Sequence, residues 1–357
     1  MNATEKTSLK NSQGFRDCVI FFLSAICILS FSSASSKGAF NGLKICSNLI
    51  IPSLFPFTVL SVFFQKSGGL LWLGNSLNKV SQFLFKLQGI DFSVILISLI
   101  GGYPIGGKII NDLYKSEIIS KEKAKKLLRF CINPSPAFLV LALGVNIFKN
   151  KNIGYIFLAS NAIACLILNL LFKGNSKGKT KKPIGAKKEF DCFSDSFVSS
   201  VFDGAKITFT ICAFVVLFSS ILEILKPLFK SPKAYALICP LLEISFGISE
   251  IKNSNLPLCF YSFLVAFGGF STILQVKQIA NNIRPSILEI VICRMFHGIL
   301  ATFISFVLFK IFPQTVMVFS NGVNITHSNT TVFFPSIMLL VFSVLFLMFA
   351  SSKKETN

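Results

Sequence analysis

The chain has 357 residues, of which 52% are hydrophobic and only 14% are charged, and its formal net charge is +20 at pH 7. Its mean hydropathy is +0.69. A soluble core of this length cannot bury so much apolar surface, so the composition excludes a soluble globular protein and indicates an integral membrane protein. Nucleic-acid binding is not expected either, because no aromatic stacking surface or recognition module accompanies the positive charge.

Charge-poor apolar runs mark the expected membrane segments. In chain order they are 17–31, 49–64, 70–85, 92–110, 136–148, 153–172, 207–225, 235–251, 256–275, 286–311 and 332–350. Several fall short of the roughly 20 residues that a straight spanning helix needs. We therefore expect an all-α, polytopic integral membrane protein with about eight spans, built with broken helices and possible re-entrant hairpins.

Positive charge sets the expected orientation. Residues 1–36 are expected to form a cytoplasmic N-terminal segment and the first transmembrane helix, and an uncleaved span is preferred there over a cleaved signal peptide. Lysines and arginines cluster in the loop 115–129 and in the stretch 173–191. Because basic loops face the cytoplasm, both are expected on that side, and 173–191 is expected to be a flexible linker.

The basic linker divides the chain into two halves, 37–172 and 192–311. Residues 312–357 are expected to hold a polar loop, a last transmembrane helix and the C-terminal tail. Charge counting leaves the side of the C-terminus open, because the run 256–275 can either cross the membrane or return to the side that it entered from.

Two prolines fall inside the second apolar run. Pro52 and Pro56 exclude a straight helix there, and we expect a re-entrant hairpin tip in preference to a kinked span because the run is short. The next run, 70–87, mixes Asn, Lys and Trp with its apolar residues and fits an interfacial amphipathic helix as well as a span.

Glycine pairs followed by an aromatic residue interrupt two further runs. They are Gly101, Gly102, Tyr103 and Pro104 in one run, and Gly268, Gly269, Phe270 and Ser271 in the other. Irregular backbone at membrane depth is tolerated only inside protein or beside a water-filled cavity. Helix breaks at matching places of two halves are how transporters build substrate sites near the midplane. We therefore expect two broken helices around a binding site; the alternative is close helix packing through the glycines.

The two halves show signs of an internal repeat. Gly42 to Ile45 and Gly204 to Ile207 each lead into an apolar run, at a separation of 204 − 42 = 162, and the glycine pairs are separated by 268 − 101 = 167. The similar separations predict two structural repeats. Whether these are parallel or inverted stays open.

The first glycine pair also opens a sequence that is similar to a phosphate-binding loop. Gly102 is followed by Gly107 and Lys108, but Ile109 stands where a magnesium-binding Ser or Thr is required. Pro104 removes a backbone donor from the expected cradle. Nucleotide hydrolysis is therefore not expected, and a broken helix with its second half starting near Ile105 explains the pattern better.

Polar side chains near the two breaks are the candidate ligands of a small solute, because an unpaired polar group in hydrocarbon must face protein, water or ligand. With the breaks themselves, the candidate substrate-binding residues are Gly101, Gly102, Tyr103, Pro104, Lys108, Asn133, Ser135, Gly268, Gly269, Ser271 and Gln275, and Asn111 and Thr272 are further polar neighbours. If Asn133, Ser271, Gln275 and Glu243 converge on one cavity, transport is favoured; if they are dispersed or face lipid, a scaffolding role is favoured.

Glu243 is the candidate for proton or ion coupling, because it lies in an apolar run and a charged group at that depth is functional by default. The alternative is a structural ion pair with a membrane-embedded cation such as Arg294. His297 is expected to be a packed helix residue. The sequence contains no nucleophile with a base and an orienting group, no carboxylate pair and no metal-ligand cluster, so neither enzymatic activity nor a metal or other cofactor is expected.

Several motifs together resemble a known family. They are 101–108, 119–121 with the helix to Leu128, 130–133, 42–57 with its Pro-Ser-Leu-Phe-Pro core, 241–245 with Gly247, and 267–275. These residues resemble the YlbJ-type sporulation integral membrane proteins, of the wider group that carries the nucleoside-recognition Gate domain. The chain departs from the expected pattern at Pro134, which adds a proline to the turn between Asn133 and Ser135.

The resemblance implies a multi-pass protein of a bacterial cell membrane, in the sporulating cell or forespore, that is needed for spore envelope and cortex formation. It implies two Gate-like repeats, 37–172 and 192–311, each pairing a hairpin with a broken helix. The implied partners are the lipid bilayer, an unknown small polar solute and other sporulation membrane proteins. A transporter-like protein is expected, with a non-transporting scaffold as the alternative; the resemblance specifies no substrate, coupling ion or oligomeric state.

Overall fold

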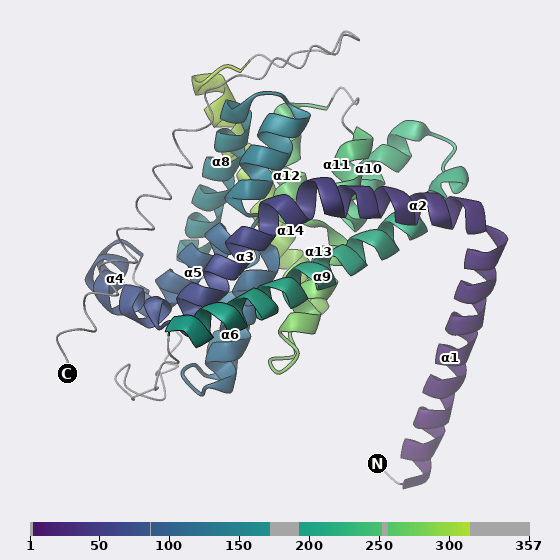
Figure 1. Cartoon of the computed structure of the whole chain (residues 1–357), viewed down its shortest axis with the longest axis horizontal. Helices are drawn as coiled ribbons and strands as arrows, with labels where there is room; N and C mark the ends of the chain where they lie inside the picture. The colour runs from purple at the N-terminus through teal and green to yellow at the C-terminus, as the bar shows by residue number, and fades with distance from the viewer. Residues whose placement is uncertain (1–2, 86, 172–192, 252–255, 315–357) are drawn as a thin grey trace. The chain divides into compact units, whose positions relative to one another are not determined.

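The computed structural model describes residues 3–85, 87–171, 193–251 and 256–314 (Figure 1). All regular secondary structure in these ranges is helical. The predicted linker 173–191 and the predicted last span 332–350 lie outside the described residues.

Five helices in the described part of the chain are long and apolar enough to cross a membrane. They are Ser32–Lys66, Lys151–Leu171, Phe193–Leu228, Leu258–Ile279 and Ile287–Ile311, and the shorter apolar helices are Gly89–Gly101, Ala137–Ile147 and Pro232–Leu242. The prediction of an all-α, polytopic membrane protein with short and interrupted helices is confirmed.

The N-terminal part contains α1 (Ala3–Ser30), α2 (Ser32–Ile45), a π-helical turn (Cys46–Ile50) and α3 (Ile51–Lys66). The predicted hairpin tip at the two prolines is wrong, because the helix continues through both of them. Pro52 lies in the first turn of α3, and the wider π-helical turn directly precedes it, where a proline ring is accommodated more easily than in a regular α-helix.

The longest α-helix of the described residues is α9 (Phe193–Leu225), which is followed by a short 3₁₀ turn (Lys226–Leu228). It lies alongside α2 and α3 (Figure 1). An added Cβ on Gly42 would lie 2.8 Å from the Val216 Cα, and one on Gly204 would lie 2.7 Å from the Val59 side chain. Small residues at these crossings let the backbones approach closely, as in other membrane helix pairs.

The first half continues with α4 (Gly69–Phe85), α5 (Gly89–Gly101) and α6 (Tyr103–Lys115). Helices α5 and α6 are the two arms of a hairpin. Ser98 of α5 bonds to Asn133, and the backbone of Gly106 of α6 is tightly packed on the Cys131 carbonyl, so both arms flank one short segment. The first glycine pair is therefore a hairpin turn, whereas the sequence predicted a break within one helix.

After the hairpin come α7 (Lys121–Leu128), a π-helix η2 (Ala137–Ile147) and α8 (Lys151–Leu171). The Ser120 hydroxyl caps α7 by accepting from the Lys123 N–H at 3.3 Å. Residues 129–135 between α7 and η2 are not helical and pass beside the first hairpin.

The second half forms a hairpin that the sequence pattern did not locate. Helices α10 (Pro232–Leu242) and α11 (Ile244–Ile251) are separated by Glu243, whose backbone is extended at φ −141°. The backbones of Gly247 and Pro240 are in tight contact, so the two arms fold back on each other.

Helices α12 (Leu258–Phe267) and α13 (Gly269–Ile279) form one interrupted span, and α14 (Ile287–Ile311) packs against α12 and α8. Gly268 interrupts the span with φ +82°, a left-handed conformation typical of a helix C-terminus and readily adopted only by glycine. The two glycine pairs thus differ in geometry, and the internal repeat stays a prediction.

Candidate functional site

A small cavity lies where the turns of both hairpins meet the start of η2 and the break between α12 and α13. It is lined by Leu54, Thr58, Gly101, Gly102, Tyr103, Pro104, Ser135, Phe138, Ile211, Glu243, Ile244, Ser245, Thr272 and Gln275. Its volume is about 30 Å³, which is enough for about one water molecule. Both halves of the chain contribute polar side chains to this closed space.

The structure brings most of the predicted site residues together. Seven of them line the cavity: Gly101, Gly102, Tyr103, Pro104, Ser135, Glu243 and Gln275. Gly268 and Gly269 lie directly beside it, because an added Cβ on the first would be 3.0 Å from the Tyr103 ring and one on the second 3.1 Å from the Pro240 carbonyl. The two glycine pairs therefore meet in space, although they are far apart in sequence.

The backbone conformation at Gly102 explains the position of Tyr103 after the hairpin turn. Gly102 has φ +92°, which favours glycine, and its N–H closes α5 by bonding to the Ser98 carbonyl at 3.1 Å. Pro104 lies in the first turn of α6, where a backbone donor is not needed. The turn thus places Tyr103 at the start of α6, against the second glycine pair.

Tyr103 connects the turn of the first hairpin to the break between α12 and α13. Its hydroxyl donates a hydrogen bond to the Val265 carbonyl at 2.5 Å. Val265 lies in the last turn of α12, where carbonyls have no helical donor. The interruption at Gly268 thus frees an acceptor for the tyrosine of the first hairpin.

Replacing Tyr103 with Phe is expected to leave the Val265 carbonyl buried without this donor. The cost is about 1–3 kcal/mol, which is measurable as a lower melting temperature of the purified protein in detergent. Tyr155→Phe is the matched control, because Tyr155 is exposed. Equal melting temperatures for the two variants would contradict a bonding role of the Tyr103 hydroxyl.

Glu243 forms the turn of the second hairpin and is 1% exposed. Its carboxylate accepts a hydrogen bond from the Phe246 N–H at 2.6 Å and so caps α11. Among the ion pairs of the described residues, none joins Glu243 to Arg294. The predicted alternative, an ion pair between Glu243 and Arg294, is therefore wrong, and the carboxylate caps α11 instead.

Arg294 is fully buried in α14, and none of its three side-chain nitrogens has a hydrogen-bond partner among the described residues. His297, on the same helix, contacts the Asn161 carbonyl at 3.1 Å, as expected for a packed helix residue.

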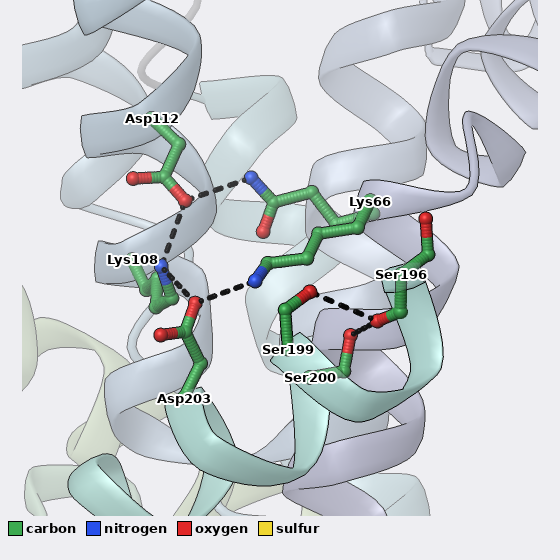
Figure 2. Close-up of polar contacts among 8 residues, drawn as sticks. Lys66, Lys108, Asp112, Ser196, Ser199, Ser200 and Asp203 are labelled. Atoms are coloured by element: carbon green, nitrogen blue, oxygen red, sulfur yellow. Dashed lines mark hydrogen bonds and ion pairs between the residues drawn. The ribbon is translucent and has the colours of Figure 1, made fainter. Parts of the chain in front are cut away.

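Lys108 does not reach the cavity. Its ammonium group pairs with Asp112 at 3.0 Å and with Asp203 at 3.4 Å, as Figure 2 shows. Lys108 lies more than a full turn beyond the start of α6, so it is directed to a different place from Tyr103.

The other polar candidates have structural partners next to the cavity. The Asn133 amide donates to the Ser98 hydroxyl at 3.0 Å and to the Phe130 carbonyl at 2.8 Å, which holds the non-helical segment against α5. Ser271 accepts a hydrogen bond from the Gln275 amide at 3.1 Å and so orients it. Asn111 accepts from Asn282 at 3.2 Å and does not line the cavity.

Sequence reasoning missed Thr58 of α3 and Ser245 of α11, which also line the cavity. Thr58 is 1% exposed and follows Pro56 in an apolar run. The signal that points to both residues is a hydroxyl in such a run, but this signal is shared with many serines that bond back to their own helix.

The electrostatic character of the cavity comes from one carboxylate and several helix starts. Helices α6, α11 and α13 begin at Tyr103, Ile244 and Gly269, and helix N-termini carry free N–H groups and partial positive charge. Glu243 offsets that charge. The arrangement can bind a small polar group through hydroxyls, an amide and backbone N–H groups, and it offers one carboxylate for a proton.

A second, larger depression of about 570 Å³ lies where α1 meets α2. Its charged groups neutralise one another, since Glu223 lies 3.6 Å from Lys37 and Lys226 lies 3.3 Å from Glu250. The smaller cavity is the better candidate site, because the residues that interrupt the helices gather there.

No protein-family model matches the chain, and no solved structure matches it. The predicted Gate domain therefore stays a prediction. The chain is 22% identical to the sporulation integral membrane protein YlbJ of Bacillus subtilis (strain 168) in an alignment 331 residues long, and 81% of this chain and 81% of that protein are covered. This similarity confirms the predicted resemblance to the YlbJ-type proteins and, together with the long apolar helices, a multi-pass membrane location for the chain.

Proposed function

We propose that the protein is a transporter-like membrane protein that moves or senses a small polar solute through the cavity between its two hairpin turns. One observation carries this proposal. Both hairpin turns, the start of η2 and the break between α12 and α13 converge on one space, which is lined by Glu243, Ser135, Thr272 and Gln275. Packing alone needs no such convergence of polar groups at membrane depth, where each unsatisfied group costs several kcal/mol.

The closed cavity is too small for an organic solute, since about 30 Å³ accommodates about one water molecule. Solute entry therefore requires the hairpin turns to separate. Two contacts must open. Tyr103 joins the first hairpin to α12, and Gly269 joins α13 to the second hairpin.

We further propose a role in sporulation, in the assembly of the spore envelope and its cortex. The similarity to a protein named for sporulation supports this proposal. The expected membrane is that of the sporulating cell or forespore, and other sporulation membrane proteins are the proposed partners. No enzymatic step or bound cofactor is part of the proposal.

The second candidate function is a non-transporting scaffold with a degenerate transporter fold. The small volume of the cavity and the use of the Glu243 carboxylate as a helix cap favour it. An uptake screen in proteoliposomes against nucleosides, peptidoglycan precursors and small anions distinguishes the two candidates. Uptake or saturable binding of one compound supports transport, and the absence of both for every compound supports the scaffold.

Replacing Glu243 with Gln is expected to remove the proton dependence of uptake. The amide oxygen can still accept from the Phe246 N–H, so the hairpin keeps its cap while the side chain can no longer ionise. The measurement is the uptake rate across a pH series. Glu289→Gln is the control, because Glu289 is partly exposed and lies in a surface ion pair with Arg129.

The coupling role of Glu243 would be ruled out by an unchanged pH profile in Glu243→Gln. Loss of folded protein in this variant would instead show that the cap needs the charge, and the melting temperature separates that outcome from a change in coupling.

A further inference from the structure

Four charged side chains form a network away from the cavity, at the interface between α6, α3 and α9. The Lys66 ammonium lies 3.1 Å from Asp203, and the Lys108 ammonium lies 3.4 Å from Asp203 and 3.0 Å from Asp112 (Figure 2). The Gln65 amide also donates to Asp112 at 3.0 Å. Two cations and two anions thus balance, and they are only partly exposed.

The network contains two kinds of contact: contacts within α6 or within the packed pair of α3 and α9, and contacts between α6 and that pair. Lys108 and Asp112 are both on α6, one turn apart. Lys66 and Asp203 join α3 to α9, which pack along each other. Among the polar contacts of the described residues, Lys108 with Asp203 and Gln65 with Asp112 connect the hairpin arm α6 to α3 and α9. Helix α6 also packs against α3.

This division makes the connection easy to break. If α6 moves away, Lys108 keeps Asp112 and Asp203 keeps Lys66, so no charge is left without a partner. Breaking a charge pair is costly chiefly when it leaves one charge buried and unpaired. The partial exposure of all four groups, from 19% to 35%, also lets water solvate them after separation.

The position of the network couples it to the hairpin turn. Lys108 and Asp112 lie on α6, and the other end of α6 begins at Tyr103 in the cavity wall. A helix transmits displacement along its axis as a rigid element. Holding the far part of α6 therefore holds the turn against the second half.

We propose that Lys66, Lys108, Asp112 and Asp203 form a reversible electrostatic latch that keeps the first hairpin, α5 and α6, closed against α3 and α9. The inference rests on the proposed function in one respect: release of the latch opens the solute cavity. The latch itself is a property of the hairpin and is measurable without any solute.

The test is hydrogen exchange of the full-length protein in lipid nanodiscs, read on peptides that cover the hairpin turn 98–106. Lys108→Met removes the ion pair between α6 and α9 and is expected to speed exchange at the turn about two- to fivefold, the effect of losing one partly exposed pair. High salt is expected to speed exchange in the wild-type protein and not in this variant.

Lys66→Met is the matched control, because it removes an ion pair of the same network but leaves Lys108 bound to Asp203. It is expected to leave exchange at the turn at or below the wild-type rate, because opening of the hairpin then leaves Asp203 without an ion-pair partner. Gln65→Leu is a second test variant that removes the other connection without changing charge, and it is expected to speed exchange at the turn as Lys108→Met does.

The latch is overturned if Lys108→Met and Gln65→Leu exchange like the wild-type protein at the turn, or if Lys66→Met speeds exchange as much as Lys108→Met. It is also overturned if exchange rises equally in α8, because the pairs would then stabilise the whole fold. A protein that binds no solute but shows the expected exchange pattern would refute the proposed transport and leave the latch standing.

Discussion

Replacing Gly269 with Val is expected to abolish function while the protein still inserts into the membrane. Gly269 has φ +80°, which strains any residue with a Cβ and a β-branched one most. A Cβ there would also lie 3.1 Å from the Pro240 carbonyl and 3.2 Å from the Ile244 N atom. Valine therefore pushes the turn of the second hairpin away from the break between α12 and α13.

Two measurements check this expectation. Membrane insertion is read by fractionation of sporulating cells, and it is expected to be normal because the apolar runs that direct insertion are unchanged. Function is read as complementation of a sporulation defect in a deletion strain. Gly102→Val is expected to behave in the same way, since Gly102 has φ +92° and its added Cβ would lie 3.1 Å from the Ser135 side chain.

Gly14→Val is the control, because nothing lies within 4 Å of a Cβ added to Gly14. It is expected to complement fully. Normal sporulation with both Gly102→Val and Gly269→Val would show that the breaks are not part of a functional site, and failure of all three variants to insert would show a general defect.

Replacing Arg294 with Met is expected to raise the melting temperature of the purified protein. Arg294 is fully buried, and none of its side-chain nitrogens has a hydrogen-bond partner among the described residues. Keeping an ion away from water costs several kcal/mol when no partner compensates it, and an apolar side chain of similar length removes that cost. An unpaired guanidinium among membrane helices therefore lowers the stability of the protein. Charged residues that are kept in membrane segments at such a cost are typically functional.

Arg129→Met is the control, because Arg129 is partly exposed and its pair with Glu289 lies at the surface. Loss of such a surface pair is expected to change stability by less than about 1 kcal/mol. A lower melting temperature for Arg294→Met would contradict the expectation and show that bound water or another group satisfies the guanidinium in the membrane. Loss of complementation by Arg294→Met without loss of folding would place Arg294 among the functional residues.

The glycine pairs illustrate what local sequence predicts well. Gly102 and Gly268 both interrupt helices, because their positive φ angles are readily adopted by glycine and both lie in apolar runs. The same pattern did not distinguish a hairpin turn from an interruption of one span. That difference depends on whether the second segment packs back on the first, as α6 does on α5, or continues in line.

The two prolines of α3 show the opposite case. The sequence favours a re-entrant hairpin tip over a kinked span at Pro52 and Pro56, yet α3 contains both prolines. Pro52 is tolerated because it lies in the first turn of α3, where no backbone donor is needed, whereas Pro56 lies inside the helix. The second hairpin was not located for a related reason: its turn is at Glu243, a residue with no special turn preference, and tight packing between Gly247 and Pro240 decides the fold there.

The sequence alone determined the class of this protein: an all-α, multi-pass membrane protein with interrupted helices, because hydropathy and the backbone need for hydrogen bonds in lipid leave few alternatives. It also identified Tyr103, Ser135, Glu243, Thr272 and Gln275 among the residues that line the cavity, since polar groups stand out in apolar runs. The tertiary structure decided which of them meet. Tyr103 bonds across to Val265, and Lys108 pairs with Asp203. Such partners come from segments distant in sequence, so their choice depends on packing that local patterns do not contain.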